Sequence, residues 1–223
     1  MEKDFSSKTD LELMVGQDEK ILWRGKPNKR GYVLEGVFNP MLPFALVWFI
    51  FDSIFIFGGI MASKESPAVG LGMLAFMLIH MMPVWIYLAG VIFIGRKYKH
   101  TEYIITDKAI YVSGGLFSYT CQMKPFAEFS RVNIRRGIID QILGVGDVVI
   151  STNETITSNK GITGNVEIAI EDIHAYKRIF SMIKELQTDV YTDTMYPNDL
   201  RPKENHGYRT EYRGRGIDIQ KDL

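Results

Sequence analysis

Two ionisable side chains stand alone inside long apolar stretches of this sequence, and their types could support proton chemistry. Asp52 lies within WFIFDSIFI, and His80 lies within LGMLAFMLIHMMPVWIYLAGVIFI. A carboxylate and an imidazole that meet can form a hydrogen-bonded pair or pass a proton between them. Ionisable groups inside a membrane are functional candidates by default, but these stretches contain few other polar stations. The composition therefore favours a structural pair, with a proton or ion relay as the alternative.

The two apolar stretches, residues 41–61 and 71–94, are long enough to cross a membrane. A helix rises about 1.5 Å per residue, so about 20 apolar residues cross a hydrocarbon core of about 30 Å. A short polar link at residues 62–70 joins them, which predicts a transmembrane hairpin over residues 41–97. Asp52 and His80 each lie nine residues from the linked end of their span. Antiparallel helices would therefore hold them at similar depth.

The charges at the ends of the two spans predict the topology. Lys and Arg near span ends stay on the cytoplasmic side. Lys64, beside Glu65, is the only basic residue in the link, and the first twenty residues are too polar for a signal peptide. We therefore expect a multi-pass protein of the cell membrane with both termini in the cytoplasm. The basic residues outside the link are Lys20, Arg24, Lys26, Lys29 and Arg30 before the first span, and Arg96, Lys97 and Lys99 after the second.

Composition excludes several classes of function. The chain has 26 basic and 26 acidic residues, so no net field points to nucleic acid as a partner. Cys121 is the only cysteine, which rules out an intramolecular disulfide and a multi-cysteine metal site. The sequence contains neither G-x-S-x-G nor H-E-x-x-H, and its four histidines lie in separate segments. We expect no enzyme activity, no catalytic residues, no metal and no cofactor.

Beyond the spans, the pattern changes to short strands followed by one amphipathic helix, which predicts an α+β cytoplasmic domain at residues 98–187. Residues 1–40 are expected to form a cytoplasmic N-terminal segment. Residues 188–223 are polar without an apolar face, which predicts a disordered tail. The expected strands are residues 102–106, 109–113, 117–123, 129–135, 147–152 and 165–170, and the expected helices are residues 138–143 and 171–187.

Three segments, EKILWRGKP, YIITDKAIYVSGGL and KPFAEFSRVNIRRGIIDQILGVGDVVIST, carry a resemblance to a known family. They resemble the bacterial pleckstrin-homology-like (PH) domain family, in its membrane-anchored type with a two-helix transmembrane hairpin, over residues 18–187. The resemblance implies a PH-like antiparallel sheet or barrel capped by a C-terminal helix, of largely unassigned role and with no catalytic residues to carry over. The matching positions in the longest segment are Pro125, Val132, Arg136, Gly137, Leu143, Gly144, Gly146 and Val148.

Gly144 and Gly146 in this motif are expected to serve the architecture. Glycines permit tight turns and close packing, here between the short helix at residues 138–143 and the next strand. A phosphate-cradling loop is the alternative, but neither Gly-Lys-Ser nor Gly-Lys-Thr follows and no long helix begins there.

Arg131 and Arg135 on the strand at residues 129–135, with Arg136 directly after it, form a candidate partner-binding patch, and a solvated sheet face is the alternative. Arg131 and Arg135 are expected on one face of this strand, with Arg136 facing away. The resulting hypothesis is a non-catalytic scaffold or protein-assembly module that contacts the bilayer through two spans and binds a protein partner or a second copy of itself. The alternatives are a small transport or channel component using Asp52 and His80, and lipid head-group sensing by the PH-like domain.

Overall fold

The computed structural model describes residues 9–157 and 163–195 of the chain, and it divides them between two compact units. The first unit, the domain, combines the residues up to Tyr32 with those from Lys97 onward. The second, the helical unit, is Val33–Arg96. The domain is therefore built from two segments of the chain, with the helical unit inserted between them. Each unit is described by itself below.

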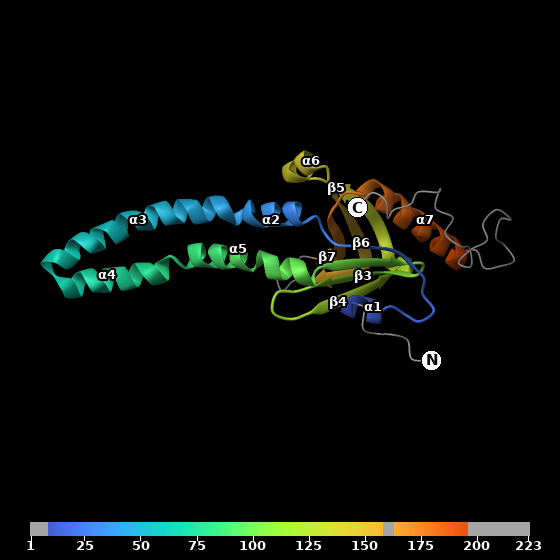
Figure 1. Cartoon of the computed structure of the whole chain (residues 1–223), viewed down its shortest axis with the longest axis horizontal. Helices are drawn as coiled ribbons and strands as arrows, with labels where there is room; N and C mark the ends of the chain where they lie inside the picture. The colour runs from blue at the N-terminus through green and yellow to red at the C-terminus, as the bar shows by residue number, and fades with distance from the viewer. Residues whose placement is uncertain (1–8, 158–162, 196–223) are drawn as a thin grey trace. The chain divides into compact units, whose positions relative to one another are not determined.

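Four antiparallel strands form the first sheet of the domain, in the order β1-β2-β3-β4 (Figure 1). Their bounds are β1 Ile21–Gly25, β2 Glu102–Thr106, β3 Ala109–Gly114 and β4 Thr120–Pro125. All five residues of β2 are buried, because both of its faces are covered. Tyr103 and Ile105 face the main core, while Ile104 packs with Leu11 of the short helix α1, Asp10–Leu13.

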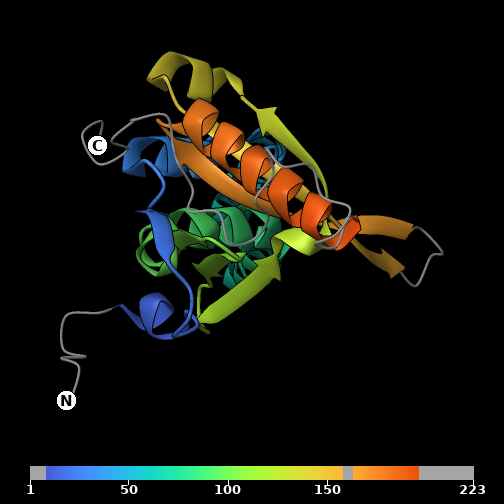
Figure 2. The same cartoon turned by 90° about the vertical axis from the view of Figure 1, so that its right-hand side faces the viewer.

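The second sheet has the order β5-β6-β7 and is also antiparallel. Its strands are β5 Phe129–Arg135, β6 Gly146–Thr157 and β7 Thr163–Ile173. The turn η1, Phe126–Glu128, precedes β5, and helix α6, Ile138–Leu143, lies between β5 and β6. Helix α7, Tyr176–Met195, follows β7 and packs against this sheet (Figure 2). The α+β architecture and the C-terminal helix are thus confirmed.

The main core of the domain draws on both sheets and on α7. It buries Trp23 of β1, Phe126 of η1 and Ile150 of β6 together with Ile179 and Ile183 of α7. Removing this much apolar surface from water is the main source of the stability of the domain. Gln187 adds a polar contact, since its side-chain amide donates to the carbonyl of Phe129 at 2.9 Å.

The glycines of the motif have the architectural roles expected of them. Gly144 ends α6 in the left-handed region at φ +70°, which a side chain would strain. A Cβ on Gly146 would lie 2.9 Å from Cγ of Arg136 and 3.0 Å from Cγ of Tyr176. Close packing of these two side chains onto the start of β6 therefore requires glycine there.

Several boundaries differ from the sequence prediction. The sequence pattern indicated one small sheet, whereas the domain has two. The predicted N-terminal segment contributes β1, which pairs with β2 across the inserted unit. The predicted strand 117–123 is displaced to Thr120–Pro125, and β6 and β7 are longer than expected.

The start of the predicted disordered tail is also corrected. Helix α7 runs to Met195, and Val190 is buried in the main core. Because Val190 continues the apolar face of the helix, the ordered chain extends past residue 188. The rest of the predicted tail, residues 196–223, lies outside the described residues.

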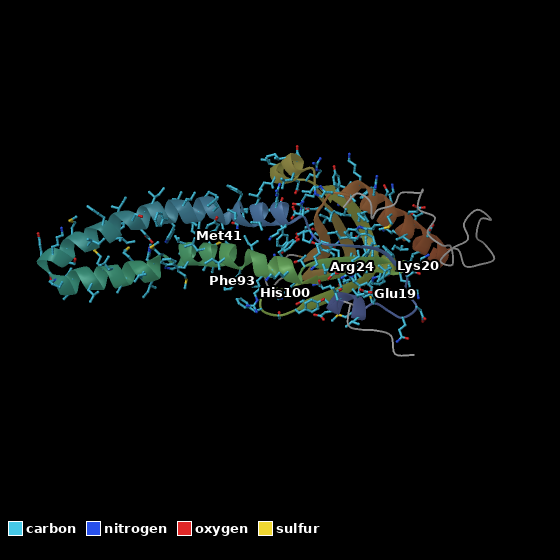
Figure 3. The ribbon with its side chains drawn as sticks, in the orientation of Figure 1. Glu19, Lys20, Arg24, Met41, Phe93 and His100 are labelled. Carbon is cyan, nitrogen blue, oxygen red and sulfur yellow. The ribbon has the colours of Figure 1, made fainter. Side chains whose placement is uncertain are left out.

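Four helices span the helical unit and its flanks: α2 Lys29–Val37, α3 Met41–Glu65, α4 Pro67–His80 and α5 Met82–His100. Figure 3 labels Met41, where α3 begins. Helix α3 is apolar and, at 25 residues, long enough to cross a membrane. Helices α4 and α5 are long and apolar enough to cross a membrane only when taken together, and they are bent by 50° at Met81. The sequence predicted one continuous helix over residues 71–94, and the structure corrects this.

Helices α3 and α4 are joined at Ser66, so the link is much shorter than the predicted residues 62–70. Pro67 suits the first position of α4, where its missing N–H would have no helical partner. A Cβ on Gly70 would clash with the backbone of Ser63, so the two helices approach closely beside this turn.

Candidate functional site

Asp52 and His80 meet in the helical unit. Asp52 lies in the middle of α3, and His80 is the last residue of α4. Nδ1 of His80 is 2.9 Å from Oδ1 of Asp52, a hydrogen-bond distance. The side chain of Asp52 is wholly buried, whereas that of His80 is 32% exposed. The counting of residues from the linked ends therefore placed these two side chains at the same level, as the structure does.

His80 sits at a break between two helices. Pro83 has no N–H to continue the helical bonding of α4. A continuous helix would also pair the His80 carbonyl with the N–H of Val84, but Val84 donates to Met81 instead. The break thus leaves backbone carbonyls without their helical donors, and the imidazole lies where α4 ends.

Two tryptophans satisfy carbonyls at this break. Nε1 of Trp48 donates to the carbonyl of His80 at 2.9 Å, and Nε1 of Trp85 donates to the carbonyl of Leu78 at 3.0 Å. A broken helix is tolerated in an apolar environment only when other groups satisfy its freed backbone. The indole donors therefore stabilise the bend that positions His80.

Aromatic rings also hold the imidazole in place. The ring of Trp48 stacks on that of His80 with centroids 5.1 Å apart and planes 19° apart. Phe76 contributes a second stacked ring at 5.6 Å. Sequence reasoning missed Trp48, although its position one helical turn before Asp52 was a usable signal.

One carboxylate oxygen of Asp52 lies outside the hydrogen bond to His80. Oδ2 of Asp52 is buried and has no hydrogen-bond partner among the described residues. Buried polar atoms are nearly always satisfied, so such an atom requires a physical explanation. An unsatisfied oxygen next to the imidazole is compatible with a structural pair or with a relay.

The three arginines of the predicted patch have separate environments. Arg131 is exposed on β5, an edge strand of the second sheet. The guanidinium of Arg135 binds Oδ2 of Asp147 through Nη2 at 3.1 Å and Nε at 3.2 Å. Arg136 donates to the carbonyls of Val145 and Asp140 and lies over the ring of Tyr176. Arg136 therefore braces the loop after α6, and only Arg131 and Arg135 share an exposed face.

Buried acids lie behind Arg135. Burial raises the pKa of Asp147, although the N–H of Asp172 and the guanidinium of Arg135 oppose that shift. Burial also raises the pKa of Glu171. The N–H of Asp172 donates to Oδ1 of Asp147 at 3.0 Å, and Asp172 itself has a positive φ of 56°. This cluster closes the β7 end of the sheet.

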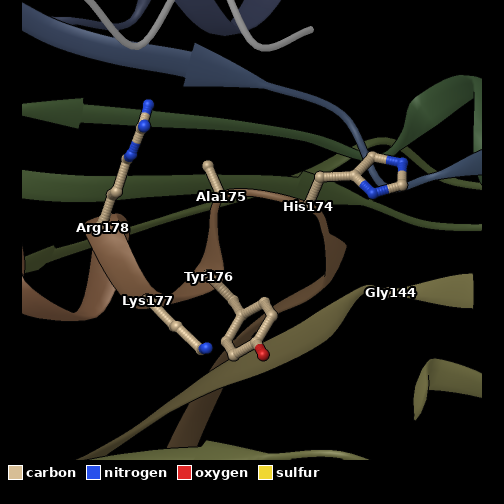
Figure 4. A pocket seen from close by; sticks show the side chains of 6 residues that line it. All are labelled: Gly144, His174, Ala175, Tyr176, Lys177 and Arg178. Carbon is tan, nitrogen blue, oxygen red and sulfur yellow. The ribbon is translucent and has the colours of Figure 1, made fainter. Parts of the chain in front are cut away.

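His174 lines three hollows of the domain, two of which adjoin the loop at Leu143 and Gly144. The first, of about 340 Å³, is lined by Gly144 and by residues 174–178 at the start of α7 (Figure 4). The second, of about 410 Å³, is lined by Asn28, Lys29, Arg30, Leu143 and His174. Nδ2 of Asn28 donates to Nε2 of His174 at 2.9 Å, while Oδ1 of Asn28 caps α2. In Figure 4 the side chains of His174, Lys177 and Arg178 point in different directions, so they do not converge on one ligand.

The segment EKILWRGKP, residues 19–27, makes several contacts with the first sheet. Both carboxylate oxygens of Glu19 accept hydrogen bonds, from Thr106 at 2.7 Å and from Tyr111 at 2.9 Å. Arg24 forms an ion pair with Glu102. These contacts fix β1 against β2 and β3 and give the segment a structural role.

Comparison with protein families finds one match, to the family described as Bacterial PH domain, over residues 49–187. This range is more than half of the chain, and it includes Asp52, His80 and Arg131. The comparisons with curated proteins and with solved structures found no match.

Proposed function

This chain belongs to the bacterial PH domain family, and from that premise we propose that it is a membrane-anchored scaffold that presents a non-catalytic PH-like domain at the cytoplasmic face. The pairing of β1 with β2 is the observation that carries the proposal. These strands are hydrogen-bonded neighbours, yet the whole helical unit lies between them in the sequence. Both ends of the helical unit must therefore return to the same side of any membrane.

An even number of crossings follows from that pairing. Helix α3 is long and apolar enough to make one crossing, which requires a second crossing to bring the chain back to β2. The bent pair α4 and α5 supplies it. A bend inside a membrane needs its freed carbonyls satisfied, and Trp48 and Trp85 satisfy two of them.

The charges support a cytoplasmic domain. Lys29 and Arg30 precede the first crossing and Arg96 and Lys97 follow the second, whereas the turn at Ser66 adjoins only the mixed pair Lys64 and Glu65. Positive charge accumulates on the cytoplasmic side. The domain therefore faces the cytoplasm, with the turn at Ser66 on the opposite side.

The exposed face of β5 is the surface that we assign to a protein partner. Arg131, Asn133 and Arg135 are all exposed and alternate along one face of this edge strand. Edge strands offer unpaired backbone groups to an added strand, and flanking arginines add charge-assisted contacts. The partner is an acidic protein segment or a second copy of this chain.

Site-specific photo-crosslinking tests the scaffold. A photoreactive amino acid at position 131 or 133 should give discrete cross-linked products in membranes, whereas one at the exposed Glu185 on α7 should not. A product of twice the mass of the chain identifies self-association. Equal cross-linking at all three positions, or none at 131 and 133, would contradict the assignment.

A proton relay is the second candidate function, and the unpartnered Oδ2 of Asp52 beside a partly exposed His80 favours it. Proton uptake by proteoliposomes under an imposed potential tests this function. A relay predicts uptake that disappears in Asp52→Asn and persists in Ser53→Ala, while the scaffold predicts no uptake in any of these proteins.

A further inference from the structure

Two exposed apolar points stand out on the domain. Ile138 and Ile142 lie one helical turn apart on α6, and their side chains are 79% and 77% exposed. Figure 1 shows α6 standing clear of the second sheet. Phe117, in the loop between β3 and β4, is 76% exposed. No other large apolar side chain among the described residues of the domain exceeds half exposure.

Basic residues lie in the chain segments beside both points. Leu143 at the end of α6 shares a hollow with Lys29, Arg30 and His174, and the side chain of Arg135, just before α6, is 60% exposed. The loop of Phe117 contacts His100, whose Nδ1 lies 3.2 Å from the carbonyl of Gly115. Lys97 and Lys99 belong to the same turn of α5 as His100. Exposed apolar side chains with lysine and arginine in the neighbouring segments are typical of contacts with an anionic lipid surface.

The sequence keeps both points beside the proposed crossings. Arg30 lies eleven residues before Met41, and His100 lies six residues after Ile94. At about 1.5 Å per helical residue, those distances are about 17 Å and about 9 Å along the chain. Helix α6 therefore lies near the segment that precedes the first proposed crossing, and the loop of Phe117 lies near the segment that follows the second.

We propose that α6 and the loop of Phe117 dip into the head-group region of the bilayer, so that the domain is held against the membrane at two points beside its anchor. This inference rests on the membrane anchoring proposed above. We assign these points to the lipid bilayer because each lies near a domain residue, Arg30 or His100, that is close in the sequence to a proposed crossing. The contact needs anionic lipid but no particular head group, because the basic residues attract the anionic surface through charge.

Fluorescence quenching in proteoliposomes tests the contact. The full chain carries Cys121→Ser and one added cysteine, labelled with an environment-sensitive dye, in vesicles of phosphatidylcholine and phosphatidylglycerol that contain lipids spin-labelled both near the head group and along the acyl chain. The labelled positions are Ile142→Cys and Phe117→Cys, with Ile50→Cys in α3 as the anchoring control and Glu185→Cys on α7 as the aqueous control.

Quenching at positions 142 and 117, together with a blue-shifted emission and no quenching at position 185, supports the contact. The quenching at positions 142 and 117 should weaken in vesicles of phosphatidylcholine alone. Quenching at position 50 without quenching at 142 and 117 overturns this inference while leaving the anchor intact. Absence of quenching at position 50 overturns the anchor itself. A protein that covers α6 instead would leave position 142 unquenched in these vesicles, which also refutes the proposal.

Discussion

Replacing Asp52 and His80 separately and together should show that they stabilise each other. His80→Phe keeps an aromatic ring against Trp48 and Phe76 but leaves the buried carboxyl of Asp52 without its one donor among the described residues. Asp52→Leu removes the acid with a side chain of similar size and leaves the imidazole without its acceptor. In the double variant both polar groups are gone and the contact becomes apolar.

The magnitudes follow from the burial of the pair. Leaving a buried polar group unsatisfied costs about 1–3 kcal/mol, so His80→Phe should lower the free energy of unfolding by that amount. Measured couplings between polar side chains in membrane proteins average about 0.6 kcal/mol and reach about 1.7 kcal/mol. Because Asp52 is wholly buried, we expect a coupling near the upper value. The double variant should therefore be more stable than His80→Phe alone, as replacement of buried pairs by apolar residues often shows.

Unfolding of the detergent-solubilised protein by sodium dodecyl sulfate, followed by circular dichroism, measures the four stabilities. Ser53→Ala combined with His80→Phe is the matched control and should be additive, because the hydroxyl of Ser53 bonds within α3 to the carbonyl of Phe49. Additive losses for Asp52→Leu and His80→Phe would refute the reasoning, since they would show that the two side chains do not interact in this protein.

Three further predictions concern the domain. Leu11→Ala should lower its free energy of unfolding by about 2–5 kcal/mol, because Leu11 is fully buried against β2 and β3, whereas the exposed Leu13→Ala should change little in the same thermal melts. Truncation after residue 187 should lower the Tm by removing Val190 from the core, while truncation after residue 195 should not; equal melting of the two truncated proteins would contradict the extended α7. Burial raises the pKa of Asp147 in the folded state, so its contribution is fully present below the ordinary Asp pKa and is lost as the pH rises through the raised value. The Tm of Asp147→Asn relative to the unaltered protein should therefore increase as the pH rises above about 4, the ordinary pKa of Asp, and a flat difference would argue against the shift.

Local patterns predicted the elements whose evidence lies within a few residues. The alternation in EYIIT and the helical spacing of residues 171–187 located β2 and the core of α7, and the family resemblance indicated α6, as the structure confirms. Strand β1 was not predicted from the sequence, because its partner β2 is separated from it by the whole helical unit. A short strand with no adjacent partner has a weak local signal. The apolar run at residues 71–94 hid the break at Met81, because hydropathy is insensitive to the missing donor of Pro83.

Some contacts of the candidate site could be predicted from the sequence, and others could not. Equal depth in a hairpin was enough to pair Asp52 with His80, whereas the stacking of Trp48 and the capping by Trp85 depend on the bend, which the sequence did not indicate. Arg136 was grouped with Arg131 and Arg135 by position alone. Its contacts to Val145 and Tyr176 arise from the path of the loop after α6, which residue spacing does not specify.

Cysteine labelling of intact and permeabilised bacterial spheroplasts tests the central claim, that two crossings hold a PH-like domain at the cytoplasmic face. The chain carries Cys121→Ser with either Ser66→Cys, at the turn between α3 and α4, or Ser181→Cys, on the exposed side of α7. A membrane-impermeant maleimide should label position 66 in intact spheroplasts and position 181 only after permeabilisation. Labelling of both positions from the same side of the membrane would contradict the account.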